Sequence, residues 1–355
     1  MQSGMNRRTA LGALAGGVGM VTGRRASAGI VFLEKTEYKG WRNAYRLRNA
    51  TIEVVVVPSV GGRILRYGFT GGPNMLWENP TVAGKPISLT TWPNTGGDKS
   101  WPWDQADWPN LIGHDWPPPP AADPAPYQAE ILNGDTLRLT SSLVSPWGIR
   151  IVRDIRVDRT GTGVFVTTRF TRVVPGESVN CAVWVVTQIP PTPFVLARLT
   201  QSVRGVLDGP LGGGFKPLGN DNRLTANFKN VARIANGALL IERDATKSAK
   251  LGTDADAFAS VHGDTLFTIR QASTAPGDNA GAEYRSGERA QVYNQPDDAE
   301  AAKQGITAYV ELEMTSPRKT IKAGETLTLA QEWRLSRLSA ADRTPERVAA
   351  LLESV

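Results

Sequence analysis

Apolar and polar residues alternate with a period of two along most of the chain after residue 28. Side chains on a β-strand point to opposite faces in turn, so this period predicts strands with at least one buried face. Asn133-Gly134, between two alternating segments, is a strong signal for a tight hairpin turn. The pattern predicts about fifteen short strands, among them 45–49, 51–58, 63–69, 74–78, 128–132, 135–143, 149–157, 164–173, 179–189, 238–243, 257–261, 265–270, 306–314 and 326–335.

A helix is predicted only at the end of the chain, over residues 340–354. Thr344-Pro345-Glu346 is typical of a helix start, because threonine accepts a backbone N–H and proline is tolerated in the first turn. No linker divides residues 29–338. The sequence shows no repeat of 20–50 residues, which counts against a propeller fold. We therefore expect an all-β chain, with one antiparallel β-sandwich domain over 29–338 and a short C-terminal helix over 339–355.

Five of the ten tryptophans lie between residues 92 and 116, among glycines and prolines. Proline lacks a backbone N–H and fixes φ, so we expect a long structured loop here, neither a helix nor a central strand. Sugars suit such a segment, because their C–H faces stack on indole and their hydroxyls form hydrogen bonds. The alternative is a plug that closes one end of the sandwich. The candidate binding residues are Asp98, Lys99, Trp101, Trp103, Gln105 and Trp108.

The predicted strand 306–314 holds the best catalytic candidates. Alternation places Tyr309, Glu311 and Glu313 on one face, with the two carboxylates about 6.5–7 Å apart. A carboxylate that faces a cleft can act as a general base. The alternative is a solvent-facing strand with two ordinary surface glutamates. Further candidates are His114, as a proton shuttle, and Arg63, Trp77, Gln188 and Tyr309, as ligand-binding residues.

Charge and composition exclude several classes of protein. The net charge is +6, but residues 1–28 contain four arginines and no acid, and without them 36 basic residues face 34 acidic ones. This balance gives no reason to expect a nucleic-acid partner. Two histidines and the single Cys181 lack the spacing of a zinc site, and no phosphate loop or dinucleotide fingerprint is present. We expect no disulfide, no metal and no cofactor.

Residues 1–28 resemble a bacterial export signal. Asn6-Arg7-Arg8-Thr9-Ala10-Leu11 is similar to a twin-arginine motif, and Ala26-Ser27-Ala28 offers small residues for cleavage. The apolar run at 11–21 is too short to cross a bilayer. We therefore expect a periplasmic or secreted protein with no membrane segment after signal removal. The alternative is a disordered cytoplasmic tail.

Several segments resemble the galactose-mutarotase-like superfamily and, within it, a family of uncharacterised bacterial β-supersandwich proteins. The matching segments, which span most of 41–335, are 43–47, 56–64, Leu76-Trp77-Glu78-Asn79, Gly96-Gly97-Asp98-Lys99-Ser100-Trp101-Pro102, Tyr309-Val310-Glu311-Leu312-Glu313, 323–325 and Trp333.

The resemblance implies an antiparallel β-supersandwich and an aldose epimerase-like site with a late-strand glutamate as base. By position that base is Glu313, with Glu311 two residues earlier. Such epimerases also use a histidine acid on a central strand, and neither His114 nor His262 matches that position. Taken with the export signal and the tryptophan-rich segment, the resemblance leads us to expect an exported carbohydrate-active protein that binds a sugar in a tryptophan-rich concave cleft. An aldose 1-epimerase-like isomerase is its enzymatic form, and a non-catalytic glycan-binding module or a structural envelope protein are the alternatives.

Overall fold

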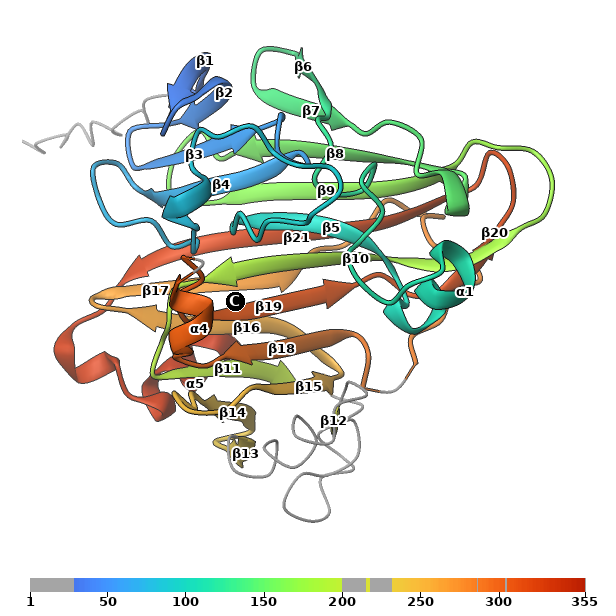
Figure 1. Ribbon diagram of the computed structural model, residues 1–355. Coiled ribbons are helices and arrows are strands. Elements are labelled where there is room, and N and C mark those ends of the chain that lie inside the picture. Colours follow the sequence, from blue (N-terminus) through green and yellow to red (C-terminus); the bar gives the residue numbers. More distant parts are fainter. Residues whose placement is uncertain (1–28, 200–214, 218–231, 286, 304, 355) are drawn as a thin grey trace, which may run out of the picture.

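Two antiparallel β-sheets pack face to face in the computed structural model (Figure 1). The structure describes residues 29–199, 215–217, 232–285, 287–303 and 305–354. In spatial order the larger sheet contains β1 Phe32–Tyr38, β2 Trp41–Arg48, β3 Ile52–Val57, β4 Arg63–Phe69, β5 Asp98–Trp103, β10 Val179–Ile189, β19 Tyr309–Thr315, β18 Ala290–Gln295, β15 Ala249–Thr253 and β12 Phe215–Pro217, with β20 Lys319–Ile321 paired to β10.

The smaller sheet is also antiparallel throughout. In spatial order it contains β13 Ala232–Ala235, β14 Ala238–Glu242, β11 Phe194–Leu199, β16 Ala255–His262, β17 Thr265–Gln271, β21 Thr326–Arg337, β9 Val164–Arg172, β8 Ile149–Val157, β7 Thr136–Thr140 and β6 Gln128–Leu132. The described helices are short: η1 Pro80–Val82, η2 Gln105–Asp107, α1 Trp108–Ile112, η3 Ser145–Trp147, α4 Ala299–Lys303, η4 Ala340–Asp342 and α5 Pro345–Glu353.

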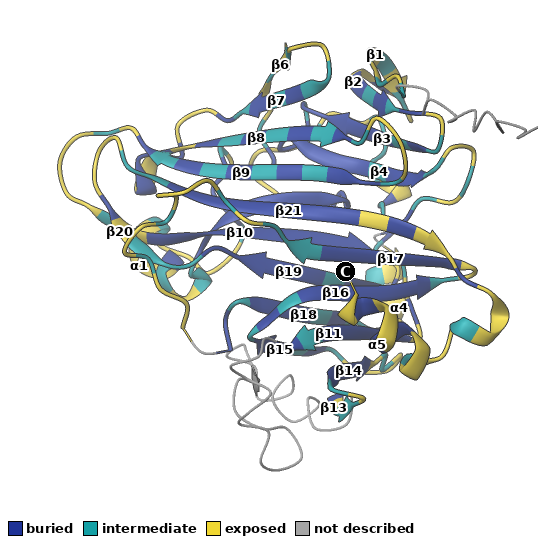
Figure 2. Ribbon diagram, turned by 180° about the vertical axis from the view of Figure 1, so that it is seen from behind, coloured by how far each residue is buried: buried dark blue, intermediate teal, exposed yellow. Residues whose placement is uncertain are grey.

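The expected all-β sandwich is confirmed, and alternation of burial explains how it packs. Along β8 and β9 every second residue is buried, because one face of the smaller sheet meets the core and the other meets solvent (Figure 2). The central strands of the larger sheet differ: β5 is buried at every residue, and β10 from Cys181 to its end. Both faces of the larger sheet are therefore covered at its centre.

The predicted hairpin at Asn133-Gly134 is confirmed. Residues 128–132 pair with 136–140 around the turn, and both turn residues have positive φ, 50° and 75°. This geometry is the one that Asn-Gly favours, since the twist of such a turn matches that of the flanking strands.

The prediction of a loop throughout the tryptophan-rich segment is wrong for two stretches. Residues 98–103 form the strand β5, in register with β10. On its β4 side, β5 pairs at Asp98 alone, so among the described residues the rest of β5 pairs with β10 only. Pro102 therefore lies in a part of β5 that resembles an edge strand, where a missing backbone N–H is tolerated. Residues 108–112 form the helix α1, with Pro109 in its first turn. The predicted strand 74–78 contributes only the isolated bridge between Glu78 and Gly96.

The C-terminal helix is confirmed as α5, preceded by the 3-10 turn η4. The Thr344 hydroxyl accepts a hydrogen bond from the Arg347 backbone N–H at 3.4 Å, and Pro345 follows it. Val348, Ala349 and Leu352 are buried against apolar residues of β11 and β16. The helix therefore covers one outer patch of the smaller sheet.

One prediction concerns residues outside those described, namely the export signal at 1–28. Across the described ranges, none of the helices combines the length and apolar character needed to cross a membrane.

Candidate functional site

Register places the two predicted glutamates on the outer face of the larger sheet, away from the smaller sheet. Val186 of β10 lies between Lys99 of β5 and Glu313 of β19 in paired register, so these side chains share a face. The preceding Asp98 points the other way, into the sandwich, where it forms a buried ion pair with Arg153 of β8. Asp98 therefore does not join the other predicted site residues.

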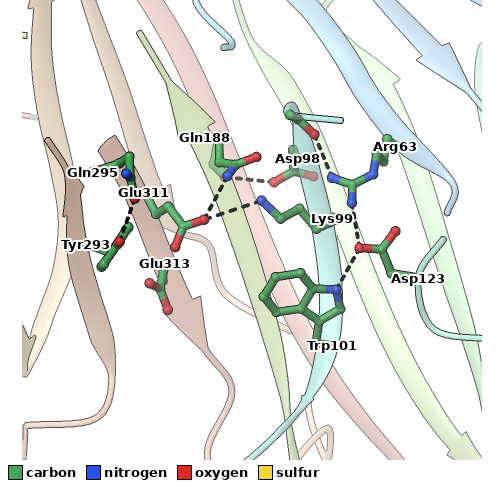
Figure 3. A network of polar contacts seen from close by, with 12 residues as sticks. Arg63, Asp98, Lys99, Trp101, Asp123, Gln188, Tyr293, Gln295, Glu311 and Glu313 are labelled. Atoms are coloured by element: carbon green, nitrogen blue, oxygen red, sulfur yellow. Dashed lines mark hydrogen bonds and ion pairs between the residues drawn. The ribbon is translucent and has the colours of Figure 1, made fainter. Parts of the chain in front are cut away.

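Glu311 lies beside two predicted residues, Lys99 and Gln188 (Figure 3). Its Oε1 accepts a hydrogen bond from Gln188 Nε2 at 2.9 Å, and Lys99 Nζ is 3.7 Å away. The glutamate side chain keeps 13% of its surface exposed, whereas Lys99 is fully buried. The structure thus brings Glu311, Gln188 and Lys99 together, with Glu311 the member that reaches solvent.

Lys99 is an unusual cation because burial removes its hydration. Its Nζ has no hydrogen-bond partner among the described residues, and its nearest ring, that of Trp101, is centred 5.3 Å away. Burial lowers the pKa of Lys99 to about 8, and the neighbouring Glu311 charge partly opposes that shift. The ammonium can therefore give up a proton more readily than an exposed lysine.

Glu313 is fully buried and already compensated. Lys250 Nζ lies 2.9 Å from its Oε1, and Trp184 Nε1 donates to its Oε2 at 2.7 Å. Burial raises the pKa of Glu313, while the Lys250 charge opposes that shift and the Glu311 charge adds to it. Sequence reasoning missed Lys250, because the short, glycine-containing strand β15 carries no clear alternation.

Tyr309 and Trp77 border the glutamates at the start of β19. Their rings are 4.8 Å apart, and Trp77 Nε1 donates to Thr307 Oγ1 at 2.8 Å. The ring of Tyr293, on the unpredicted strand β18, lies 6.1 Å from that of Tyr309. Burial raises the pKa of Tyr309 well above its usual value, so its phenol stays protonated.

Arg63 is engaged by the protein itself. It is fully buried, and it donates to the Gly96 carbonyl at 2.6 Å and to Asp123 Oδ2 at 2.5 Å. The same Asp123 oxygen accepts from the indole N–H groups of Trp92 and Trp101, at 2.7 and 3.0 Å. Sequence reasoning missed Asp123; its one signal is its position as a lone acid within the proline- and alanine-rich stretch 117–126.

The tryptophans pack against one another, which forms what we term the tryptophan cluster. Neighbouring ring centres lie 4.8–6.4 Å apart, mostly edge to face, the arrangement that aromatic quadrupoles favour. The predicted ligand-binding rings of Trp101, Trp103 and Trp108 are buried inside it, while Trp116 is 42% exposed. The cluster consists of Trp92, Trp101, Trp103, Trp108, Trp116, Trp147 and Trp184.

The remaining predicted residues lie elsewhere. His114 is exposed in the turn after α1, and Gln105 Nε2 donates to the Asp115 carbonyl at 3.0 Å, within the same segment. His262 belongs to β16 in the smaller sheet, where burial lowers its pKa to about 4. None of the hydrogen bonds or ion pairs seen among the described residues joins a histidine to Glu311 or Glu313.

No protein-family model matches the chain, and no curated protein is detectably similar to it in sequence. Solved structures do resemble it. A proposed aldose 1-epimerase from Klebsiella pneumoniae is 10% identical, with a TM-score of 0.58, over 90% of this chain and 86% of that one. A proposed aldose 1-epimerase from Escherichia coli K12 is 10% identical, with a TM-score of 0.52, over 87% and 99%.

A TPR-domain-containing protein from Parabacteroides distasonis is 13% identical, with a TM-score of 0.51, over 85% of this chain but only 48% of that one. At such identities the likeness concerns the fold: the chain has the galactose-mutarotase-like β-sandwich fold that its sequence resemblance implied.

Proposed function

We propose that this chain, which has the galactose-mutarotase-like fold, binds a carbohydrate over Glu311 on the outer face of the larger sheet and interconverts the anomers of an aldose. The observation that carries the proposal is the Lys99–Glu311 pair, in which a partly exposed carboxylate lies 3.7 Å from a buried ammonium. Anomer exchange needs a base and an acid side by side, and this pair offers both.

The proposed reaction opens the sugar ring by two proton transfers, one from the anomeric hydroxyl and one to the ring oxygen. Glu311 takes the proton of the anomeric hydroxyl, the bond between the anomeric carbon and the ring oxygen breaks, and Lys99 gives a proton to that oxygen. The open-chain aldehyde rotates, and the reverse transfers close the ring as the other anomer. Lys99 takes the acid role that a histidine has in the epimerases this chain resembles, and its pKa of about 8 suits a proton donor at neutral pH.

Glu313 takes a supporting role in this proposal, although the sequence resemblance pointed to it as the base. Its carboxylate is held by Lys250 and Trp184, whereas the equally buried Nζ of Lys99 has no hydrogen-bond partner among the described residues. The Glu313 charge therefore influences the ionisation of the neighbouring Glu311, but Glu313 does not contact the sugar in this proposal. Glu311 is therefore the carboxylate that we assign to the substrate.

A second candidate function is carbohydrate binding without turnover. The observation that favours it is the separation of both histidines from the glutamates, since His114 is exposed in a loop and His262 lies in the smaller sheet. In that case Glu311 and Gln188 would orient sugar hydroxyls only.

The proposal is tested by NMR exchange spectroscopy of the anomers of neutral and acidic aldoses with the purified protein. We expect the wild type to accelerate anomer exchange, and Glu311→Gln to lower that rate about 100-fold or more. Glu34→Gln is the matched control, because Glu34 is exposed on β1 at the edge of the sheet, and it should behave as the wild type.

Thermal shift measurements on the same sugars separate the two candidates, because a ligand of the folded state raises the melting temperature. A raised melting temperature without faster exchange would favour the binding module. If no aldose either shifts the melting temperature or exchanges faster, both candidates are wrong.

We also propose that the protein is exported from a bacterial cytoplasm, on the basis of the twin-arginine-like segment at residues 6–11. N-terminal sequencing of the mature protein from its native host should begin after Ala28. A mature chain that retains residues 1–28 would contradict export by this signal.

A further inference from the structure

A cavity of about 520 Å³ lies beyond the far end of β19 from Glu311. Gln271, in its wall, donates to the carbonyl of Thr315, the last residue of β19, at 3.0 Å. Thr315 is four residues beyond Glu311, or about 13 Å along a strand, so this cavity is distinct from the candidate site. Its walls include Asp256 of β16, Gln271 of β17, Thr328 of β21, and Asp278, Tyr284 and Arg289 from the segment between β17 and β18. We term it the Arg289 cavity.

The side chain of Gln271 holds two residues of the wall in place. Its Oε1 accepts from Tyr284 Oη at 3.0 Å and from Arg289 Nε at 2.9 Å. Its Nε2 donates to the carbonyls of Thr315 and Arg289, at 3.0 and 3.3 Å. The amide thus uses both donors and both acceptor sites, and the phenol and the guanidinium are positioned before a ligand arrives.

The segment that forms one wall is fixed to the smaller sheet. The Asn279 side chain donates to the Thr328 carbonyl and accepts from the Thr328 N–H, both at 2.8 Å. The Ala272 N–H donates to the Ala330 carbonyl at 2.8 Å. Both contacts join residues that line the cavity, so its shape is built into the fold.

Arg289 offers a cation that no acid of the described chain neutralises. Its guanidinium lies 5.1 Å from the centre of the Tyr284 ring, and the residue is half-buried. Nε is bound to Gln271, and no other hydrogen bond or ion pair between described residues uses its remaining N–H groups. A planar guanidinium in this state can bind a carboxylate through two parallel hydrogen bonds.

Two acids in the wall limit the class of anion. Asp256 is already paired, since its Oδ1 accepts from Arg198 Nε at 2.8 Å. Asp278 belongs to none of the ion pairs in the part of the chain that the structure describes, and its Oδ2 accepts from the Ala275 N–H at 3.3 Å. A dianion such as phosphate would be repelled by Asp278. A single carboxylate with hydroxyl groups suits both charges, because the hydroxyls can donate to Asp278.

We propose that the Arg289 cavity binds a sugar acid, whose carboxylate meets the Arg289 guanidinium and whose hydroxyls donate to Asp278. The cavity volume lies in the range of small-molecule sites, which suits one sugar unit. The hydroxyls of Ser273 and Thr274 in the same wall can donate and accept, which favours a ligand with several hydroxyls over an amino acid. The site is separate from Glu311 and needs no turnover there.

The test uses the full chain labelled with ¹³C-tyrosine, in which Tyr284→Phe identifies the Tyr284 resonance by its loss. Methyl β-D-glucopyranosiduronate and D-gluconate are the probes, and they separate a closed ring from an open-chain sugar acid. Methyl β-D-glucopyranoside, inorganic phosphate and L-alanine are the comparison ligands. We expect at least one sugar acid to shift the Tyr284 resonance saturably, with an affinity about tenfold or more above that of the comparison ligands.

Variants separate this site from its surroundings. Arg289→Gln should weaken the Tyr284 titration about tenfold or more, because it removes the charged donors. Arg285→Gln is the matched control, since Arg285 has a side chain 59% exposed and is not in the cavity wall. Glu311→Gln should also leave the titration unchanged. If Arg289→Gln fails to fold, Asp278→Ala, at an exposed position, should weaken binding about threefold by removing an acceptor.

A Tyr284 resonance that neither sugar acid shifts overturns the inference, as does equal binding of phosphate, L-alanine or the neutral glycoside. An unchanged affinity in Arg289→Gln, or in Asp278→Ala where that variant replaces it, also overturns it. Shifts confined to Tyr293 and Tyr309, which lie beside Glu311, overturn it too, yet they would support sugar binding over Glu311. A Tyr284 titration by a sugar acid without faster anomer exchange of any aldose would support this cavity and count against the proposed enzyme.

Discussion

At the scale of the residue, neighbours in sequence have opposite environments. Asp98 and Lys99 are adjacent on β5, but Asp98 pairs with Arg153 inside the sandwich and Lys99 faces Glu311 on the outer side. Strand alternation predicted that Glu311 and Glu313 share a face. It gave no means to separate Asp98 from Lys99, because residues 98–103 were interpreted as a loop.

Lys99 should destabilise the folded protein at neutral pH. Its folded pKa of about 8 lies below the usual 10.5, so the charged form is disfavoured by folding. The penalty is fully present below pH 8, shrinks as the pH rises from 8 to 10.5, and vanishes above that. We expect Lys99→Met to raise the free energy of unfolding by about 2–3 kcal/mol at pH 7.

Urea denaturation of both proteins at pH 7 and pH 10 measures this difference, which should narrow at the higher pH. A variant less stable than the wild type at pH 7 would show that the Lys99–Glu311 attraction outweighs the loss of hydration.

At the scale of the element, the strands found from sequence are those with clear alternation and a marked turn. Residues 149–157 and 179–189 match β8 and β10 at both ends. The strands that were missed are short, or contain glycine or polar residues, such as β15 and β18, and tertiary packing decides their conformation. Lys250 and Tyr293 were missed for that reason, since each lies on one of these strands.

The cap of α5 gives a quantitative test at this scale. Thr344→Ala removes the side-chain acceptor for the Arg347 N–H, and we expect the free energy of unfolding to fall by about 1 kcal/mol. Ser339→Ala is the matched control, because Ser339 precedes η4 without a capping bond to the backbone. Chemical denaturation should show a change within about 0.5 kcal/mol for that control; equal losses in both variants would argue against a specific cap.

At the scale of the whole molecule, the class of fold followed from alternation, hairpin turns and the lack of a linker. Burial of the central larger sheet on both faces did not follow from these patterns. It depends on segments distant in sequence, such as Asp123 holding Trp92 and Trp101 by their indole N–H groups. A local pattern of apolar residues carries no information about such long-range contacts.

The C-terminal helix should stabilise the folded protein by covering an apolar patch. Val348, Ala349 and Leu352 cover an apolar patch of the smaller sheet that includes Leu196 and Leu240. A chain that ends at Leu338 would expose this patch, with an expected loss of about 4 kcal/mol in the free energy of unfolding. Denaturation and binding of an apolar dye measure the effect, and Leu351→Ala is the control, since Leu351 is 38% exposed. An unchanged stability after truncation would contradict this role.

The tryptophan cluster also has an optical consequence. Seven indoles with ring centres 4.8–6.4 Å from their neighbours will pass excitation energy among themselves before they emit light. Fluorescence from the cluster will then report the final acceptor of that migration, whichever of its rings absorbed the photon. A ligand that touches one ring would dim or shift the emission of all seven, which makes the cluster a sensitive but spatially blind reporter of events on the outer face.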